Sequence, residues 1–335
     1  MKVGIIGLPN VGKSSLFNLL TNAGAQVAKF PFTTIDRNVG MVSIPDERIE
    51  KIVEMTKSPK MKYAGIEFLD IAGLIKDAHK GEGLGNKFLA HIRDVDLIIH
   101  LLRCFTAPDV AHISSQLSPD DDYAIVRTEL LLSDLEIVER RIEKIKKVAE
   151  FRKEFLKLEK AKDELAHGRI PGKAATADLP LLSTKPEIVV PNLDDDGQFK
   201  SDQDGYKISV KLEEEIVEFA EDEKKELRED AGVAIDGLPG LIRLCLSNLS
   251  TIIFYTIKGE ETRAWPVTQG TRVIEGAGKI HTDMQKGFIK AEVLAYADFI
   301  KSGGFTEAQN LGYTKIEGKD YILHDGDIIL IKFRA

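Results

Sequence analysis

The sequence predicts an α/β protein with a doubly wound domain, an inserted helical hairpin and a small C-terminal α+β domain. Three observations lead to this prediction. Short apolar strands near the N-terminus alternate with segments long enough for helices. A stretch rich in Leu, Glu, Lys and Arg follows with the apolar spacing of paired helices. After about residue 251 the chain breaks into short β-type pieces separated by turn residues.

The first domain is predicted from a series of apolar segments. Residues 2–7 have the β-branched density of a buried parallel strand, and the next segment places Leu16, Leu19 and Leu20 on one face of a helix. Further strands are expected at residues 65–69, 97–101 and 187–190. Because parallel strands need long crossovers, the intervening segments predict helices that pack on a parallel sheet.

The insert is predicted from apolar residues that recur at alternating spacings of four and three, which is a heptad seam. The seam consists of Leu131, Leu135, Val138, Ile142, Ile145 and Ala149. Phe155 and Leu158 continue the pattern, and residues 168–172 end it with Gly and Pro. We expect two long helices or an antiparallel hairpin. With twelve Lys/Arg and ten Asp/Glu over residues 127–169, this insert is either a solvated spacer or an RNA contact.

The C-terminal domain is predicted from strands at residues 251–257, 288–293 and 327–333, with turn residues such as Asp325 and Gly326 between them. The predicted boundaries are 1–126 and 184–250 for the first domain, 127–183 for the insert and 251–335 for the last domain.

Composition narrows the class of protein further. The net charge is −8 over 335 residues, which excludes a strongly basic nucleic-acid binder and leaves only local RNA contacts. No apolar run is long enough to cross a bilayer, and the N-terminus lacks the pattern of a signal peptide. We expect a cytoplasmic monomer without membrane contact. Cys104 and Cys245 lie in apolar surroundings without CxxC spacing and are interpreted as core residues.

A phosphate-binding loop follows the first strand. The segment GLPNVGKS at residues 7–14 fits the pattern GxxxxGK[ST] between a strand and a helix. In such a loop backbone N–H groups surround the phosphates, Lys13 reaches the β and γ oxygens and Ser14 offers its hydroxyl to Mg²⁺. The residues predicted to bind nucleotide here are Asn10, Val11, Gly12, Lys13, Ser14 and Ser15.

Two further segments have the pattern of metal and switch motifs. Asp70 closes an apolar strand and is followed by Gly73, so we predict that Asp70 holds Mg²⁺ through water and that the Gly73 amide senses the γ-phosphate. Thr34 is the predicted switch threonine, which joins the metal shell when triphosphate is present, and Thr33 is the second candidate. The predicted metal ligands are thus Ser14, Thr34 and Asp70, and the predicted catalytic residues are Lys13, Thr34 and Gly73.

Base recognition is predicted from a less regular motif. Guanine-reading sites use NKxD, whereas residues 192–195 read Asn-Leu-Asp-Asp, with Leu193 at the lysine position. An acidic turn is the alternative interpretation. Ser209 and Val210 resemble the loop that closes over the base. The predicted base contacts are therefore Asn192, Leu193, Asp195, Ser209 and Val210.

With these motifs the chain resembles the YchF subfamily of Obg-related P-loop proteins, the Obg-like ATPases, over nearly its whole length. The resemblance rests on GLPNVGKS at 7–14, FPFTTI at 30–35, DIAGL at 70–74, KGEGLGNKFL at 80–89, RCF at 103–105, AGKIHTD at 277–283 and KGFI at 286–289. It implies a GTPase-like domain, an inserted coiled-coil hairpin and a C-terminal ubiquitin-like TGS domain. It also implies ribosome association and hydrolysis of ATP, often in preference to GTP.

Departures from the family pattern refine these expectations. The family has NxxE where this chain ends in Asp195, so use of both ATP and GTP is expected. Leu74 stands where Ras-like enzymes carry the glutamine that orients water, which implies slow intrinsic turnover. Asn10 matches the P-loop asparagine of K⁺-stimulated GTPases, so K⁺ is a candidate cofactor beside Mg²⁺. The alternatives are a nucleotide-regulated binding module and, less favoured, a P-loop kinase.

Overall fold

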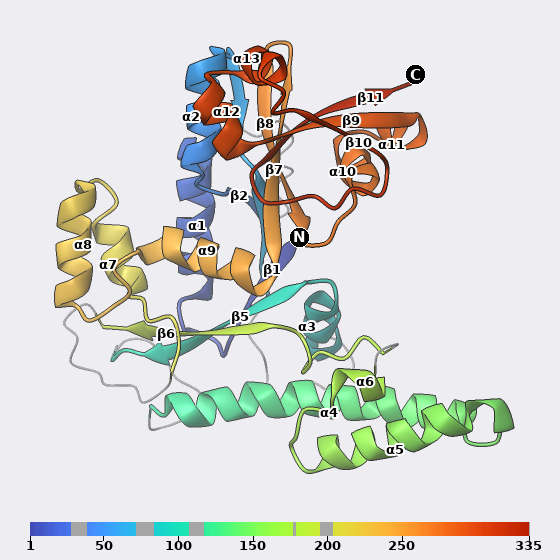
Figure 1. The fold of residues 1–335 in the computed structure, drawn as a ribbon. Helices are drawn as coiled ribbons and strands as arrows, with labels where there is room; N and C mark the ends of the chain where they lie inside the picture. Colours follow the sequence, from blue (N-terminus) through green and yellow to red (C-terminus); the bar gives the residue numbers. More distant parts are fainter. Residues whose placement is uncertain (28–38, 72–83, 107–116, 177–178, 195–203, 335) are drawn as a thin grey trace. The chain divides into compact units, whose positions relative to one another are not determined.

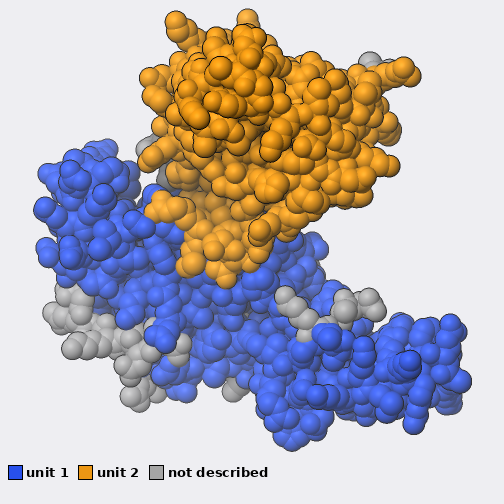
Figure 2. All heavy atoms as spheres, viewed as in Figure 1, with its two compact units in different colours: residues 1–22, 34–40, 67–241 blue, residues 23–33, 41–66, 242–335 orange. Residues whose placement is uncertain are grey.

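The computed structural model describes residues 1–27, 39–71, 84–106, 117–176, 179–194 and 204–334. Within these ranges the chain forms two compact units, shown in Figure 2. Unit 1 comprises Met1–Asn22, Thr34–Gly40 and Glu67–Leu241, and unit 2 comprises Ala23–Thr33, Met41–Ile66 and Ile242–Ala335. Among the described helices, none combines the length and the apolar character that a membrane crossing requires.

A five-stranded sheet forms the centre of the α/β fold (Figure 1). Its strands, in spatial order, are β2 (Val39–Ser43), β4 (Gly65–Asp70), β1 (Lys2–Ile6), β5 (Leu97–Cys104) and β6 (Glu187–Leu193). β1 pairs in parallel with β4 and β5, and β5 pairs in parallel with β6. Every residue of β5 is buried, as expected of a central parallel strand. The predicted doubly wound α/β architecture is confirmed.

Helices lie between the strands of this sheet and after its last strand, β6, and two of the later ones pack on β5. The helices are α1 (Lys13–Val27), α3 (Leu84–Arg93), α7 (Val210–Glu215), α8 (Glu221–Asp230) and α9 (Gly237–Asn248). Leu102 and Cys104 of β5 share an apolar cluster with Leu212 of α7 and Ala231 after α8. In this cluster Cys104 is fully buried, and Cys245 is likewise buried in α9, which confirms both cysteines as core residues.

The predicted insert is an antiparallel hairpin of α4 (Pro119–Ile145) and α5 (Arg152–Ala166), joined by a short 3₁₀ turn η1 (Ala149–Phe151) and followed by α6 (Lys173–Thr176) (Figure 1). The apolar seam packs between α4 and α5. Helix α4 begins eight residues before the predicted insert because Ser118 caps it, Pro119 occupies its first turn and three aspartates favour its N-terminus. Ala149 is exposed in η1, so the seam ends at Ile145 and not at Ala149.

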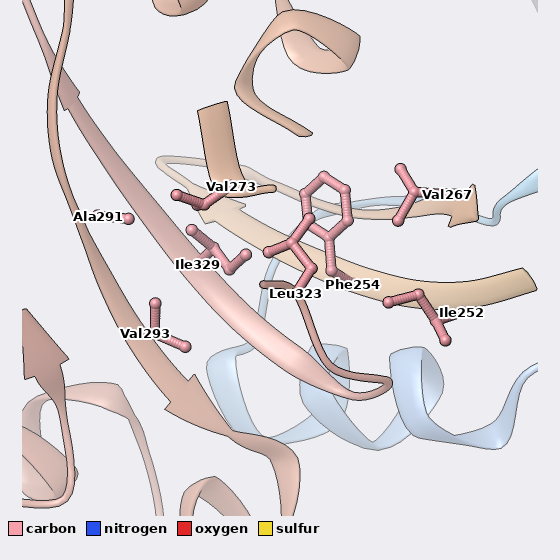
Figure 3. Close-up of a cluster of buried hydrophobic side chains, with 8 residues drawn as sticks. All are labelled: Ile252, Phe254, Val267, Val273, Ala291, Val293, Leu323 and Ile329. Carbon is pink, nitrogen blue, oxygen red and sulfur yellow. The ribbon is translucent and has the colours of Figure 1, made fainter. Parts of the chain in front are cut away.

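Unit 2 is built on a six-stranded sheet. In spatial order its strands are β10 (Lys315–Glu317), β9 (Phe288–Ala295), β11 (Asp327–Phe333), β7 (Thr251–Lys258), β8 (Glu261–Thr268) and β3 (Lys60–Lys62). Its helices are α2 (Glu47–Thr56), α10 (Val273–Ile280), α11 (Thr282–Lys286), α12 (Tyr296–Ser302) and α13 (Phe305–Asn310). Phe254, Leu323 and Ile329 lie at the centre of its apolar core, which Figure 3 shows. The predicted small α+β fold is confirmed.

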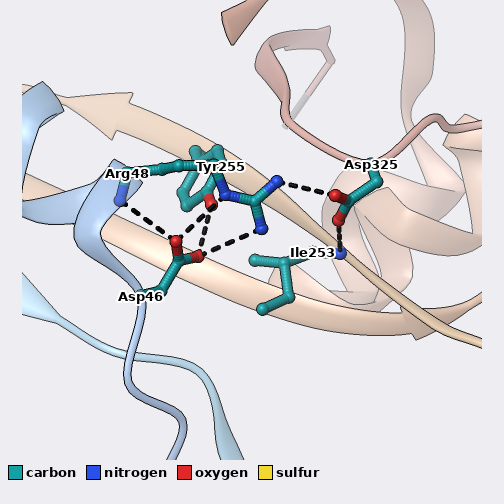
Figure 4. Close-up of polar contacts among 5 residues, drawn as sticks. All are labelled: Asp46, Arg48, Ile253, Tyr255 and Asp325. Carbon is teal, nitrogen blue, oxygen red and sulfur yellow. Dashed lines mark hydrogen bonds and ion pairs between the residues drawn. The ribbon is translucent and has the colours of Figure 1, made fainter. Parts of the chain in front are cut away.

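The segment Met41–Ile66 belongs to unit 2, although the main part of that unit, Ile242–Ala335, begins far later in the sequence. β3 pairs in parallel with β8, and the Arg48 guanidinium donates to Asp325 at 2.6 Å and to Asp46 at 3.0 Å (Figure 4). The Tyr255 hydroxyl also donates to Asp46, and burial together with that hydrogen bond raises the pKa of Tyr255. This packing was not predicted. The predicted first domain, residues 1–126 and 184–250, includes the segment Met41–Ile66 because the boundaries were drawn along the sequence.

Candidate nucleotide-binding site

The loop between β1 and α1 has the backbone conformation of a phosphate-binding loop. Gly7, Asn10 and Gly12 have φ values of 149°, 63° and 99°. A Cβ atom on Gly12 would lie 2.7 Å from the side-chain nitrogen of Asn192, so only glycine fits at this positive φ and close approach. The carbonyl of Gly12 accepts the first hydrogen bond of α1 from the Leu16 amide at 2.9 Å. The loop therefore leads directly into a helix N-terminus, the structure that binds phosphate.

Lys13 is held inside this loop. Its side chain is 7 % exposed, and the ammonium donates to the carbonyl oxygen of Leu8 at 2.7 Å. Burial lowers the pKa of Lys13 to about 8, and the nearby charge of Asp70 opposes that shift. A poorly solvated cation interacts strongly with anionic phosphate oxygens, because little water screens the charge. The position of Lys13 thus suits phosphate binding.

Ser14 and Asp70 meet beside the loop, as a shared metal site requires. The Ser14 hydroxyl donates to Asp70 Oδ2 at 2.7 Å. The other carboxylate oxygen, Oδ1, is buried and has no hydrogen-bond partner among the described residues. Asp70 stands at the C-terminal end of β4, next to β1 in the sheet. One hydroxyl and one carboxylate with an unsatisfied oxygen fit the ligands that Mg²⁺ takes at phosphate sites, where it keeps several waters.

The Asn192 side chain joins three segments of the chain. Its Nδ2 donates to the carbonyl oxygen of Val11 at 3.0 Å, and its Oδ1 accepts from the amide of Val210 at 2.9 Å. The two partners fix the orientation of the amide, because one is only an acceptor and the other only a donor. Asn192 is 4 % exposed. It therefore ties the P-loop to the end of β6 and to the start of α7.

A cavity of about 480 Å³ opens at this junction. Its walls come from the P-loop, the end of β5, the end of β6 and the first turn of α7: Gly12, Ser15, Phe105, Thr106, Asn192, Leu193, Asp194, Val210, Lys211 and Glu214. All four segments belong to unit 1. The volume falls in the range of small-molecule and cofactor sites, and the mixed lining suits a heterocyclic ring with polar edges.

The wall at Phe105 and Thr106 is fixed by two polar contacts. Asp194 Oδ2 accepts from the Thr106 amide at 3.1 Å and from its hydroxyl at 3.2 Å. The Arg103 guanidinium lies over the Phe105 ring, 4.7 Å from the ring centre. Thr106, Asp194 and Glu214 line the cavity without having been predicted as site residues. Thr106 and Asp194 follow the ends of β5 and β6, and this position was their signal, because ligands in parallel α/β folds bind at the carboxyl ends of strands. Glu214 lies within α7 and had no such signal.

The structure brings together most of the residues predicted to bind nucleotide, although they come from distant parts of the chain. Ser209 is fully buried and its hydroxyl accepts from the Leu212 amide, so its side chain caps α7 and its neighbour Val210 lines the cavity. The predicted Thr34, Gly73 and Asp195 lie outside the described residues, as do Thr33 and Leu74.

Two family models match separate parts of this chain. Residues 2–160 match the model described as "50S ribosome-binding GTPase", which supports a nucleotide-binding P-loop domain. Residues 251–334 match the model YchF-GTPase_C, described as "Protein of unknown function (DUF933)".

Full-length relatives are similar to this chain from end to end. "Ribosome-binding ATPase YchF" of Bacillus subtilis is 39% identical over 365 residues and covers 100% of both chains. Its counterpart in Escherichia coli O157:H7 is 37% identical and covers 100% of this chain and 99% of the relative. The solved structure of the Schizosaccharomyces pombe YchF GTPase is 30% identical, with a TM-score of 0.85, and the match covers 99% of this chain and 97% of that one. The identity of 37–39% over the full length and the TM-score of 0.85 with a solved YchF structure show that this chain belongs to the YchF family.

Proposed function

We propose that this chain is a ribosome-associated nucleoside triphosphatase that hydrolyses ATP, and GTP as a second substrate, with Mg²⁺. The observation that carries the proposal is the meeting of Ser14 and Asp70 at 2.7 Å beside the buried ammonium of Lys13. Asp70 lies at the end of β4, and its buried Oδ1 has no hydrogen-bond partner among the described residues. Phosphoryl transfer needs positive charge beside the phosphates. Lys13 would supply one charge, and the Mg²⁺ that Ser14 and Asp70 would hold would supply the other.

In this proposal each phosphate-side residue has one role. Lys13 exchanges its contact with the Leu8 carbonyl for the β and γ oxygens. Ser14 and Asp70 would hold Mg²⁺, Ser14 by its hydroxyl and Asp70 through water, and Thr34 would join them in the triphosphate state. Mg²⁺, when bound, neutralises charge that develops on the phosphate oxygens. The Gly73 amide senses the γ-phosphate, and Asn10 to Ser15 supply the remaining loop contacts.

The cavity beside Gly12 is the proposed base site. Asn192 positions its walls through Val11 and Val210, Leu193 and Val210 provide apolar contacts, and Asp195 reads the base edge. Ser209 contributes by holding the first turn of α7 in place. Leucine at position 193 replaces the lysine of guanine-specific sites, and this supports use of both purines.

Ribosome association is proposed from the full-length relatives, which are named ribosome-binding ATPases. RNA is the proposed contact within that partner. We further propose a cytoplasmic monomer, K⁺ as a second cation beside Asn10, and domain boundaries at 1–126 with 184–250, 127–183 and 251–335. These boundaries follow the chain, whereas the compact units also group Met41–Ile66 with the C-terminal part.

One experiment tests the proposed function. ATP and GTP analogues are titrated into the full chain in a calorimeter, with and without purified ribosomes, and turnover is measured under the same conditions. We expect both nucleotides to bind with Mg²⁺ and ribosomes to accelerate hydrolysis. Binding without turnover in either condition would favour the nucleotide-regulated binding module instead.

A further inference from the structure

The tip of the helical hairpin carries a concentrated positive charge. We define the tip as residues 140–157, which comprise the end of α4, the turn with η1 and the start of α5. In Figure 1 this turn lies at the end of the hairpin remote from β5 and β6, strands of the same unit. The tip holds eight Lys/Arg and three Asp/Glu, a net charge of +5. Since the whole chain is at −8, the remainder carries −13.

Part of this charge is paired within the tip, and part is not. Glu154 accepts from Arg141 at 2.7 Å, and Glu143 accepts from Lys146. Lys144, Lys147 and Lys153 are exposed and make no ion pair within 4 Å among the described residues. They lie in the last turn of α4, in the connecting turn and in the first turn of α5, so they surround the end of the hairpin.

Apolar and aromatic groups lie among these cations. Val148 is 42% exposed and Phe151 is 36% exposed. Neither residue belongs to the apolar cluster that packs between α4 and α5. The Arg141 guanidinium lies 5.5 Å from the centre of the Phe151 ring. A shallow cavity of about 300 Å³ opens here, lined by Ile145, Lys146, Lys147, Val148, Ala149, Arg152 and Phe155. An exposed ring between cations is the pattern of surfaces that bind phosphates and stack on bases.

We infer that the hairpin tip is a docking surface for the phosphate backbone of folded RNA. The inference rests on the proposed ribosome association and names the part of this chain that makes the contact. Charge complementarity selects the partner, because RNA is a dense polyanion and the remainder of this acidic chain repels it. Lysines placed as separate point charges around a turn suit phosphates spaced along a strand. An acidic protein is the competing partner, and the experiment separates the two.

The test uses two full-length variants with equal changes in charge. The tip variant carries Lys144→Gln, Lys147→Gln and Lys153→Gln. The control variant carries Lys225→Gln, Lys279→Gln and Lys319→Gln, three lysines that are likewise exposed and make no ion pair among the described residues. Gln and Lys have similar helix propensities, so both variants should fold, and circular dichroism and ATP titration verify this.

Binding is measured to an RNA hairpin of about 20 base pairs at several KCl concentrations, and to purified ribosomes by co-sedimentation. Each lost phosphate contact lowers the slope of log affinity against log salt by about one, so the tip variant should lose about two to three units of slope. Its ribosome binding should fall about tenfold or more, while the control variant keeps both properties.

Equal slopes and equal ribosome binding in the two variants would overturn the inference. Lost ribosome binding with unchanged RNA binding would also overturn it and would assign the tip to an acidic protein. If the wild-type chain binds the RNA hairpin through the tip but never binds ribosomes, the proposed ribosome association fails and the RNA-binding surface stands.

Discussion

The side-chain amide of Asn192 donates to the carbonyl oxygen of Val11 at 3.0 Å across 181 residues of sequence. The same side chain accepts from the Val210 amide, so one buried residue holds the P-loop, the end of β6 and α7 together. Gly12 makes this approach possible, because any side chain there would meet the Asn192 amide. The nucleotide cavity therefore depends on a contact between its phosphate side and its base side.

Asn192→Ala tests this contact. The substitution leaves the Val11 carbonyl and the Val210 amide without their partner in a buried setting, which should cost about 1–3 kcal/mol of stability. We expect ATP affinity to fall about tenfold or more, measured by calorimetry. Asn248→Ala is the matched control, because among the described residues the Asn248 side chain donates to the Leu244 carbonyl within α9 and makes no hydrogen bond with the P-loop. Unchanged affinity in a folded Asn192→Ala protein would contradict the role assigned to Asn192.

Base selection gives a second prediction. ATP and GTP should bind within about tenfold of each other, a difference of about 1.4 kcal/mol, because Leu193 removes the lysine contact while Asp195 can still accept from guanine. Competition titrations with both nucleotides measure the ratio. Asp195→Glu should move it toward ATP if this loop reads the base. A hundredfold preference in the wild-type protein would show that residues 192–195 do not read the base as proposed.

The fold and the site were predictable from sequence to different degrees. Strands and the hairpin follow from local periodicity, and the strand expected at 327–333 agrees with β11. The contact between Arg48 and Asp325 spans 277 residues and has no local pattern, so the membership of α2 in unit 2 could not be predicted. The contact between Thr106 and Asp194 in the cavity wall could not be predicted for the same reason, because the two residues are 88 positions apart.

Potassium dependence is the third prediction. Asn10 lies in the P-loop at a positive φ of 63°, and K⁺ beside it would supply charge that an arginine finger provides elsewhere. Hydrolysis should be faster in K⁺ than in Na⁺ at matched ionic strength, because K⁺ would supply part of the factor of about 10³-fold or more that an arginine finger gives. Asn10→Ala should erase the difference while Mg²⁺-nucleotide binding persists. Equal rates in both salts, with and without ribosomes, would remove K⁺ from the account.

Acid sensitivity of unit 1 is the fourth prediction. Burial raises the pKa of the Glu187 carboxyl, but the hydrogen bond from His100 and the charges of His100 and Arg127 outweigh it and lower that pKa below 4.5. Arg127 donates to Glu187 at 3.0 Å and links α4 to β6. Because the folded-state pKa is depressed, this carboxylate stabilises the fold above pH 4.5, and the contribution is lost as pH falls through the folded-state value.

Glu187→Gln isolates that contribution. At pH 7 it should destabilise the protein by about 3 kcal/mol, because Arg127 and His100 then lack their buried partner. Urea unfolding at pH 7 and below pH 4 should show a smaller loss of stability on acidification in the variant than in the wild type. Glu221→Gln, on an exposed residue of α8, is the control. Identical acid profiles in variant and wild type would contradict this assignment.

The loop around Lys13 is proposed to bind and hydrolyse nucleoside triphosphate. Single-turnover ATP hydrolysis, with Mg²⁺ and ribosomes present, tests it most directly by comparing the wild type, Lys13→Ala and the exposed-site control Lys225→Ala. The Lys13→Ala protein should fold, since it loses only a poorly solvated cation, and its rate should fall about 100-fold or more. A folded Lys13→Ala protein that hydrolyses ATP at the wild-type rate would contradict the claim.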